Sequence, residues 1–117
     1  MKKIILLPLL PLYLSVTAQT GSAAFPFPVT GGIVISEIMA DPTPSRGLPE
    51  REYLEIFSLS RDTLELKGIM LIAGNDTAYL PEGVAAPGEL IILCSTGSRA
   101  DLLPFGRVMA VKSFPSL

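Results

Sequence analysis

Short apolar runs, separated by turn-forming residues, make up most of the chain after residue 32. The runs are rich in Ile, Val, Leu and aromatic residues, which favour β-strands, and Gly, Pro, Asn and Asp stand between them. No stretch keeps the helical period of roughly 3.6 residues long enough to predict an extended helix. The pattern predicts strands over 33–39, 52–59, 62–66, 69–73, 77–80, 89–95 and 108–112.

Specific turn signals lie between these predicted strands. Gly74-Asn75-Asp76 predicts a tight hairpin turn between two of them. A loop rich in Pro and Gly is expected over 81–88, where Pro87-Gly88 fits the two central positions of a type II turn. Residues 99–103 predict one helical turn, with Ser98 as its N-cap.

Short strands at this spacing predict an all-β fold, either a sandwich or a barrel. Seven strands suit an immunoglobulin-like β-sandwich, which is the fold we expect. The strand over 89–95 is the most hydrophobic, so we expect it in the middle of a sheet. In the strand over 52–59, Leu54 and Ile56 should face the core, because burying Glu55 would be costly.

The first residues have the features of a secretory signal peptide, which we place at 1–18. Lys2 and Lys3 give a positive start, residues 4–14 are apolar and uncharged, and Val16-Thr17-Ala18 fits a cleavage site. A transmembrane anchor is the alternative, but the run is shorter than the roughly 20 residues that a bilayer requires. The sequence therefore predicts export to the periplasm, the outer surface or the medium, with no stable membrane span after cleavage.

Two further segments follow the predicted signal peptide. Residues 19–32 contain several Gly and Pro residues and are expected to be a linker. Residues 33–117 hold all the predicted strands and form the expected sandwich domain.

Composition excludes several kinds of site. The 117 residues carry 9 Lys and Arg against 11 Asp and Glu, for a net charge of −2, with no His and a single Cys. Without His there is no Ser-His-Asp triad and no His-ligated zinc, and one Cys allows no internal disulfide. A weakly acidic chain without a basic run is also a poor nucleic-acid binder. Cys94 ends an apolar run and is expected to be a buried small hydrophobe.

A set of acidic residues around the first two predicted strands is the main candidate for chemistry. These carboxylates could bind calcium, which takes six to eight oxygen ligands, or supply an acid/base pair of the glycosidase kind. They could also form a solvated strand end in which Arg46 or Arg51 pairs with the acids. The set is Glu37, Asp41, Glu50, Glu52 and Glu55, of which Glu37, Asp41, Glu52 and Glu55 are the candidate calcium ligands; no other cofactor is indicated.

Four aromatic residues allow two interpretations. They could line a ligand-binding surface, or they could belong to the core, which is the commoner place for aromatics on alternating strand positions. They are Tyr53, Tyr79, Phe105 and Phe114.

Several short motifs, in order along 33–117, resemble the lamin-tail domain in the form found in exported bacterial proteins. The motifs differ from the family pattern at Ser36, where Asn is usual, and at Ile69, where Trp is frequent. The family also continues past the last motif into further strands. The matching pieces are 35–42, 52–56, 66–71, 80–83 with 87–90, and 105–106 with 113–117.

The resemblance implies an immunoglobulin-like sandwich that lacks its last one or two strands, or a fragment of a longer protein. It also implies a secreted binding or architectural module with no catalytic residues, acting on an unidentified protein or cell-envelope partner. An incomplete sheet would favour edge-strand pairing or a dimer. The alternatives are an accessory domain of an exported hydrolase of the nuclease or phosphodiesterase type, and a calcium-stabilised adhesion domain.

Overall fold

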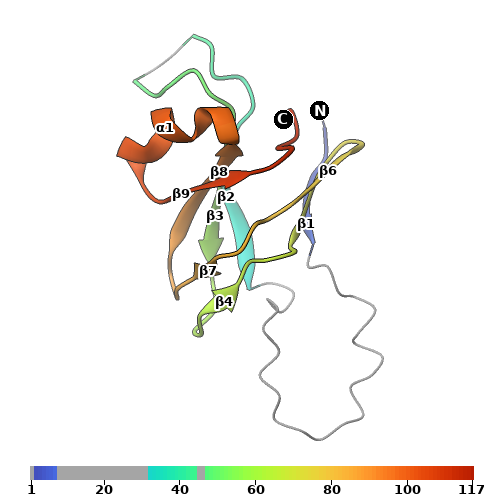
Figure 1. Ribbon diagram of the computed structural model, residues 1–117, viewed down its shortest axis with the longest axis vertical. Helices are drawn as coiled ribbons and strands as arrows, with labels where there is room; N and C mark the ends of the chain where they lie inside the picture. The colour runs from blue at the N-terminus through green and yellow to red at the C-terminus, as the bar shows by residue number, and fades with distance from the viewer. Residues whose placement is uncertain (1, 8–31, 45–46) are drawn as a thin grey trace, which may run out of the picture.

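The computed structural model describes residues 2–7, 32–44 and 47–117, which fold into an all-β sandwich (Figure 1). One short helix, α1, spans Arg99–Leu102 between two 3₁₀ turns, η2 (Thr96–Ser98) and η3 (Leu103–Phe105). The strands are β1 (Ile4–Leu7), β2 (Ile33–Met39), β3 (Tyr53–Ser58), β4 (Leu64–Glu65), β5 (Met70–Ala73), β6 (Asp76–Tyr79), β7 (Val84–Ala85), β8 (Leu90–Ser95) and β9 (Val108–Val111).

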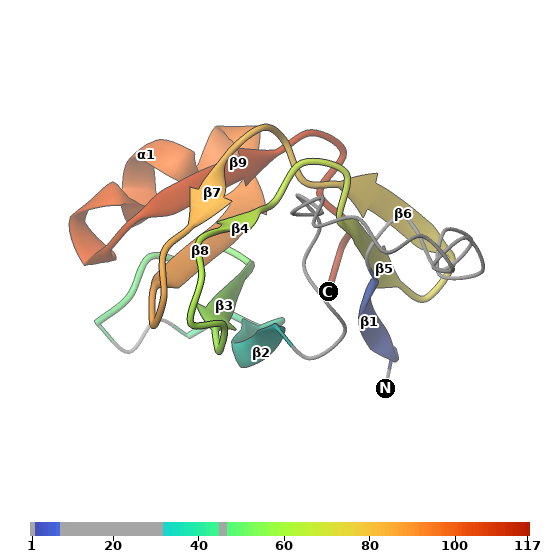
Figure 2. The same cartoon turned by 90° about the horizontal axis from the view of Figure 1, so that it is seen from below.

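The strands form three sheets. The largest has the order β2-β3-β8-β9, the second β1-β5-β6, and a two-stranded sheet pairs β4 with β7. All pairs are antiparallel except β8 with β9, which is parallel. A view from below shows the four-stranded sheet on one side of the molecule and β5 and β6 on the other (Figure 2).

All seven predicted strands are present, with ends within a few residues of those expected. The predicted central position of the strand over 89–95 is confirmed, because β8 lies between β3 and β9. Two strands were not predicted. β7 lies inside the expected loop over 81–88, and β1 lies inside the predicted signal peptide.

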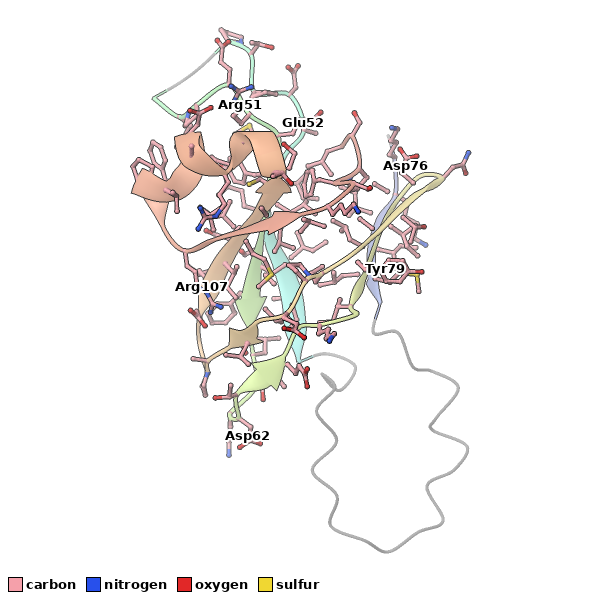
Figure 3. The ribbon with its side chains drawn as sticks, viewed as in Figure 1. Arg51, Glu52, Asp62, Asp76, Tyr79 and Arg107 are labelled. Atoms are coloured by element: carbon pink, nitrogen blue, oxygen red, sulfur yellow. The ribbon has the colours of Figure 1, made fainter. Side chains whose placement is uncertain are left out.

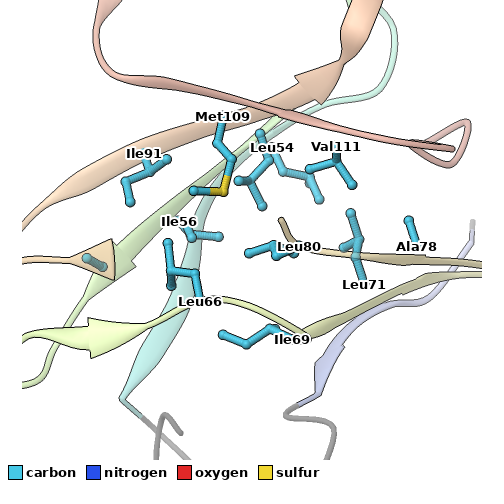
Figure 4. Packing of buried hydrophobic residues seen from close by; sticks show 12 residues of the cluster. Leu54, Ile56, Leu66, Ile69, Leu71, Ala78, Leu80, Ile91, Met109 and Val111 are labelled. Atoms are coloured by element: carbon cyan, nitrogen blue, oxygen red, sulfur yellow. The ribbon is translucent and has the colours of Figure 1, made fainter. Parts of the chain in front are cut away.

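The main core fills the space between the sheets. Leu54 and Ile56 of β3 are fully buried in it, as the alternation of this strand predicted. Figure 4 shows Leu54, Ile91 and Met109 of the four-stranded sheet facing Leu66 and Leu80 across this core. We call this side of the four-stranded sheet its inner face.

The opposite, outer face of the four-stranded sheet carries a second and smaller apolar cluster. It contains residues of four elements: Tyr53, Ile92, Cys94, Leu102 and Val108. Partly buried Met39 and Leu48 pack against it. α1 therefore covers one end of this face, and Figure 1 shows it at the opposite end of the sheet from β4 and β7.

The predicted turns are present. Glu89 donates its backbone N–H to the carbonyl of Ala86 at 3.1 Å, and Gly88 has a φ of 72°, as the third residue of a type II turn requires. The predicted hairpin of β5 and β6 is present, but its turn is shorter than expected, because Asp76 belongs to β6 and pairs with Ala73. Ser98 is the N-cap residue of α1, as predicted. Its side chain makes no capping hydrogen bond, and its hydroxyl lies 2.9 Å from that of Ser95.

The N-terminal predictions are tested only in part. Within the described residues 2–7 of the predicted signal peptide, residues 4–7 form the edge strand β1 on β5. The rest of the predicted signal peptide and nearly all of the linker over 19–32 lie outside the described residues. No helix in the described part of the chain is long and apolar enough to cross a membrane. The immunoglobulin-like topology stays a prediction.

Candidate functional site

Two of the predicted acidic residues meet on the outer face. Glu37 of β2 lies directly opposite Glu55 of β3, at a point where the register shifts between Ile35 and Glu37. Like charges in this position repel each other. Each carboxylate accepts a hydrogen bond from a neighbouring hydroxyl, because Tyr53 donates to Glu37 at 2.7 Å and Ser36 donates to Glu55 at 2.8 Å.

Tyr53 links this carboxylate pair to the apolar cluster under α1. Its side chain is only 4% exposed, and its hydroxyl bonds to Glu37. Burial, the hydrogen bond to Glu37 and the negative charges of Glu37 and Glu55 raise the pKa of Tyr53 to about 12. Tyr53 is therefore a neutral hydrogen-bond donor at physiological pH and not a base.

The remaining acidic residues lie elsewhere. Asp41 accepts a hydrogen bond from the Thr43 hydroxyl at 3.3 Å. Glu52 accepts the backbone N–H of Leu117 at 3.4 Å, and with Glu50 it lines an open cleft of about 380 Å³. Figure 3 shows Arg51 and Glu52 at the end of the molecule near α1.

The predicted arginine partner of these acids is engaged with another residue. The Arg51 side chain donates to Asp101 of α1 at 2.8 Å, which ties the end of the long loop to the helix. Arg46, the other candidate partner, lies outside the described residues. Glu37, Asp41 and Glu50 are exposed to solvent, as the interpretation of a solvated strand end expects. Arg51 does not neutralise them, because it pairs with Asp101.

The arrangement does not assemble a metal centre. Within residues 2–7, 32–44 and 47–117, no three His, Cys, Asp or Glu side chains are grouped so that they could hold a metal ion. Glu37 and Glu55 come together, while Asp41 and Glu52 face other partners. The calcium site over Glu37, Asp41, Glu52 and Glu55 stays a prediction without geometric support.

An apolar row lies beside the carboxylate pair on the outer face. Val34 pairs with Phe57, and Phe57 pairs with Leu90, so these side chains share one face across β2, β3 and β8. Their chain neighbours Ile35, Ile56 and Ile91 pack in the inner core, which places the row on the outer face. We call Val34, Phe57 and Leu90 the outer row.

The outer row remains open to solvent. Val34 is 37% exposed, Leu90 is 48% exposed, and Phe57 is partly buried. β9 does not reach this row, because its first residue, Val108, pairs with Ile92. α1 packs over the other end of the sheet. α1 and β9 therefore cover the neighbouring part of the outer face but leave the outer row uncovered.

Sequence reasoning missed the outer row. Val34, Phe57 and Leu90 are as apolar as their buried neighbours, so no local signal separates them from the core. Of the aromatics proposed for a ligand surface, Tyr53 is buried, whereas Tyr79 and Phe105 are about half exposed. Tyr79 lies on β6, on the far side of the molecule from α1 (Figure 3). Phe114 is partly buried against the main core.

Cys94 is fully buried in the small cluster, as predicted. Burial raises the pKa of its thiol, so the reactive thiolate is disfavoured. Its role is packing between β8 and α1.

Comparison of the chain with protein-family models, with curated proteins and with solved structures finds no match. The proposed function therefore rests on the fold and on the outer face of the four-stranded sheet.

Proposed function

We propose that this chain is an exported, non-catalytic interaction module that binds a partner protein through the outer row. The observation that carries the proposal is the open row of Val34, Phe57 and Leu90 on three adjacent strands. Contiguous apolar side chains that stay exposed beside a well-packed core are typical of binding surfaces.

The neighbouring residues define the chemistry of the partner. Glu37 and Glu55 lie in the adjacent row. Among the described residues, their hydrogen-bond donors are the neutral hydroxyls of Tyr53 and Ser36, and no cation pairs with them. A partner that fits would present apolar side chains for the outer row and Lys or Arg for the carboxylates. Binding should therefore weaken as salt concentration rises.

Two features of the sequence support the rest of the proposal. The Lys2-Lys3 start and the apolar run after it support export through a cleaved leader. The resemblance of 33–117 to the lamin-tail domain supports an architectural role within a surface or exported protein. The partner would then be another exported or cell-envelope protein.

The test is site-specific photocrosslinking in cells that export the chain. A photoreactive amino acid replaces Leu90 in one variant and Thr63, an exposed residue in the loop before β4, in the control. We expect a defined adduct from position 90 that is absent from position 63 and that decreases with salt. No adduct from position 90, or the same adducts from both positions, would overturn the proposal.

A further inference from the structure

One edge of β5 is paired with β1, whose residues would be removed when the predicted signal peptide is cleaved. β1 pairs with β5 in antiparallel register, Ile4 opposite Ala73 and Leu7 opposite Met70. Ile4 and Leu6 pack against the main core. Because residues 4–7 lie inside the predicted leader, the removal of that leader in the proposed function takes this strand away.

The loss of β1 would leave defined groups of β5 without partners. Gly74 donates its N–H to the carbonyl of Lys3, and Ile69 uses its carbonyl for Leu80 on the β6 side. Backbone groups alternate in direction along a strand, so Met70 and Ile72 point toward β1. In the processed chain their N–H and C=O groups would form an open edge.

This edge lacks the protection that the edge strands β2, β6 and β9 have. β2 carries a register shift and the charged Glu37, and β6 begins with the charged Asp76. α1 packs against β9. By contrast, β5 reads Met-Leu-Ile-Ala, with no charge, no proline and a continuous register along both of its neighbours. Such an edge favours pairing with another strand.

A linker strand with Phe25 and Phe27 in the places of Ile4 and Leu6 would bond poorly to β5. Lys3 directs its carbonyl to β5, so Ile5 and Leu7 bond to β5 while Ile4 and Leu6 face the core. An equivalent strand from Phe25–Val29 would place its phenylalanines in the core and its prolines where β5 needs an N–H donor. Proline has no N–H to donate.

A second β5 strand reproduces β1 closely. A twofold axis through Leu71 would pair Leu71 with its copy and Ala73 with Ile69 of the copy. Leu71 then stands in the place of Leu6, and Ile69 in the place of Ile4, so the same two residue types face the core. Met70 and Ile72 of the two chains would exchange the hydrogen bonds that β1 makes.

We propose that the processed chain forms a dimer by antiparallel pairing of β5 with β5 of a second copy. The result is one continuous sheet in the order β6-β5-β5-β6. In the unprocessed chain β1 occupies this edge and blocks the pairing of β5 with β5.

The test is sedimentation velocity on the unprocessed chain and on residues 19–117. We expect a monomer and a dimer, respectively. Ile4→Asp with Leu6→Asp in the unprocessed chain should release β1 and also give a dimer, without any change in chain length. Circular dichroism of each sample confirms the fold.

Two proline variants of the processed chain locate the interface. Ile72→Pro removes an N–H that points to the second copy, and we expect dimer association to weaken by at least about tenfold. Thr77→Pro is the matched control. Leu80 bonds toward β5, so Thr77 points to the outer edge of β6, where proline is tolerated. It should leave the dimer intact.

Each contrary result overturns the dimer. A folded monomer of both the processed chain and Ile4→Asp/Leu6→Asp would show that the edge does not bind a copy. Loss of the dimer with Thr77→Pro but not with Ile72→Pro would place the interface on β6. If the processed chain stays a monomer and binds an added peptide of residues 2–7, the β5 edge accepts a separate strand and not a second copy. Leu90→Glu should leave the dimer unchanged, which separates this proposal from partner binding by the outer row.

Discussion

The two faces of the β2-β3-β8-β9 sheet use the same strands for different purposes. On the inner face, Leu54, Ile91 and Leu93 are fully buried against the other two sheets. On the outer face, α1 and the small cluster cover one end, and the outer row remains open at the other. One alternating pattern therefore supplies both a core and an exposed apolar surface.

The difference shows that alternation alone does not determine burial. Leu90 and Leu93 belong to the same strand and are chemically identical, yet Leu93 is fully buried and Leu90 is 48% exposed. What separates them is the layer that faces each side. Stability should depend on the inner face, and recognition on the outer row.

The largest expected effect comes from the two leucines of β8. Leu93→Ala removes a fully buried side chain and should lower the free energy of unfolding by about 2–5 kcal/mol, because it leaves a cavity. Leu90→Ala, its matched control, should change it by about 0.5 kcal/mol or less. Urea denaturation measures both. Equal losses would contradict the division between the faces.

Tyr53 gives the next effect, at alkaline pH. Its pKa is about 12 in the folded chain and about 10 when unfolded, so the folded state holds the phenolic proton more tightly. The stability from this proton is fully present below pH 10 and is lost as pH rises toward 12, by roughly 2 kcal/mol.

Thermal unfolding between pH 9 and 12 measures this loss. Tyr53→Phe should remove the part of the slope that Tyr53 contributes, and Tyr79→Phe, an exposed control, should not. An unchanged slope in Tyr53→Phe would contradict the burial of this hydroxyl against Glu37.

A smaller effect is expected at Glu89, which joins β8 to the strand that follows α1. The hydrogen bond from Arg107 at 2.7 Å, followed by that from the Ala86 N–H, lowers the pKa of Glu89. The contribution is therefore present above the usual pKa of Glu and is lost as pH falls through the lowered value. Because Arg107 is 39% exposed, Glu89→Gln should cost at most about 1 kcal/mol.

Acid titration of the melting temperature checks this prediction. Glu82→Gln is the control, because Glu82 forms a fully exposed pair with Lys67. We expect a reduced acid slope in Glu89→Gln and an unchanged profile in Glu82→Gln. A larger change in the acid dependence of the melting temperature for Glu82→Gln than for Glu89→Gln would contradict this prediction.

The sequence predicted the strands well, because they depend on local alternation and turn residues. The bounds of β2 were predicted without error, and those of β3, β5 and β8 within a residue or two. β7 was missed because it has only two residues and exists through its pairing with β4. β1 was missed because its apolar residues fit a leader equally well.

The candidate site was predicted less well, because it depends on register and cover. The register shift in β2 brings Glu37 opposite Glu55, while Asp41 and Glu52 turn to other partners. The exposure of Val34, Phe57 and Leu90 depends on where β9 begins and where α1 ends. Neither is encoded near these residues.

The most direct test of the outer row compares capture of exported partners by the wild-type domain, by Leu90→Glu and by Thr63→Glu. Thermal unfolding is recorded for all three. The outer-row account predicts that Leu90→Glu captures at least about tenfold less partner with a melting temperature near that of the wild type, while Thr63→Glu captures the normal amount. Undiminished capture by Leu90→Glu would contradict it.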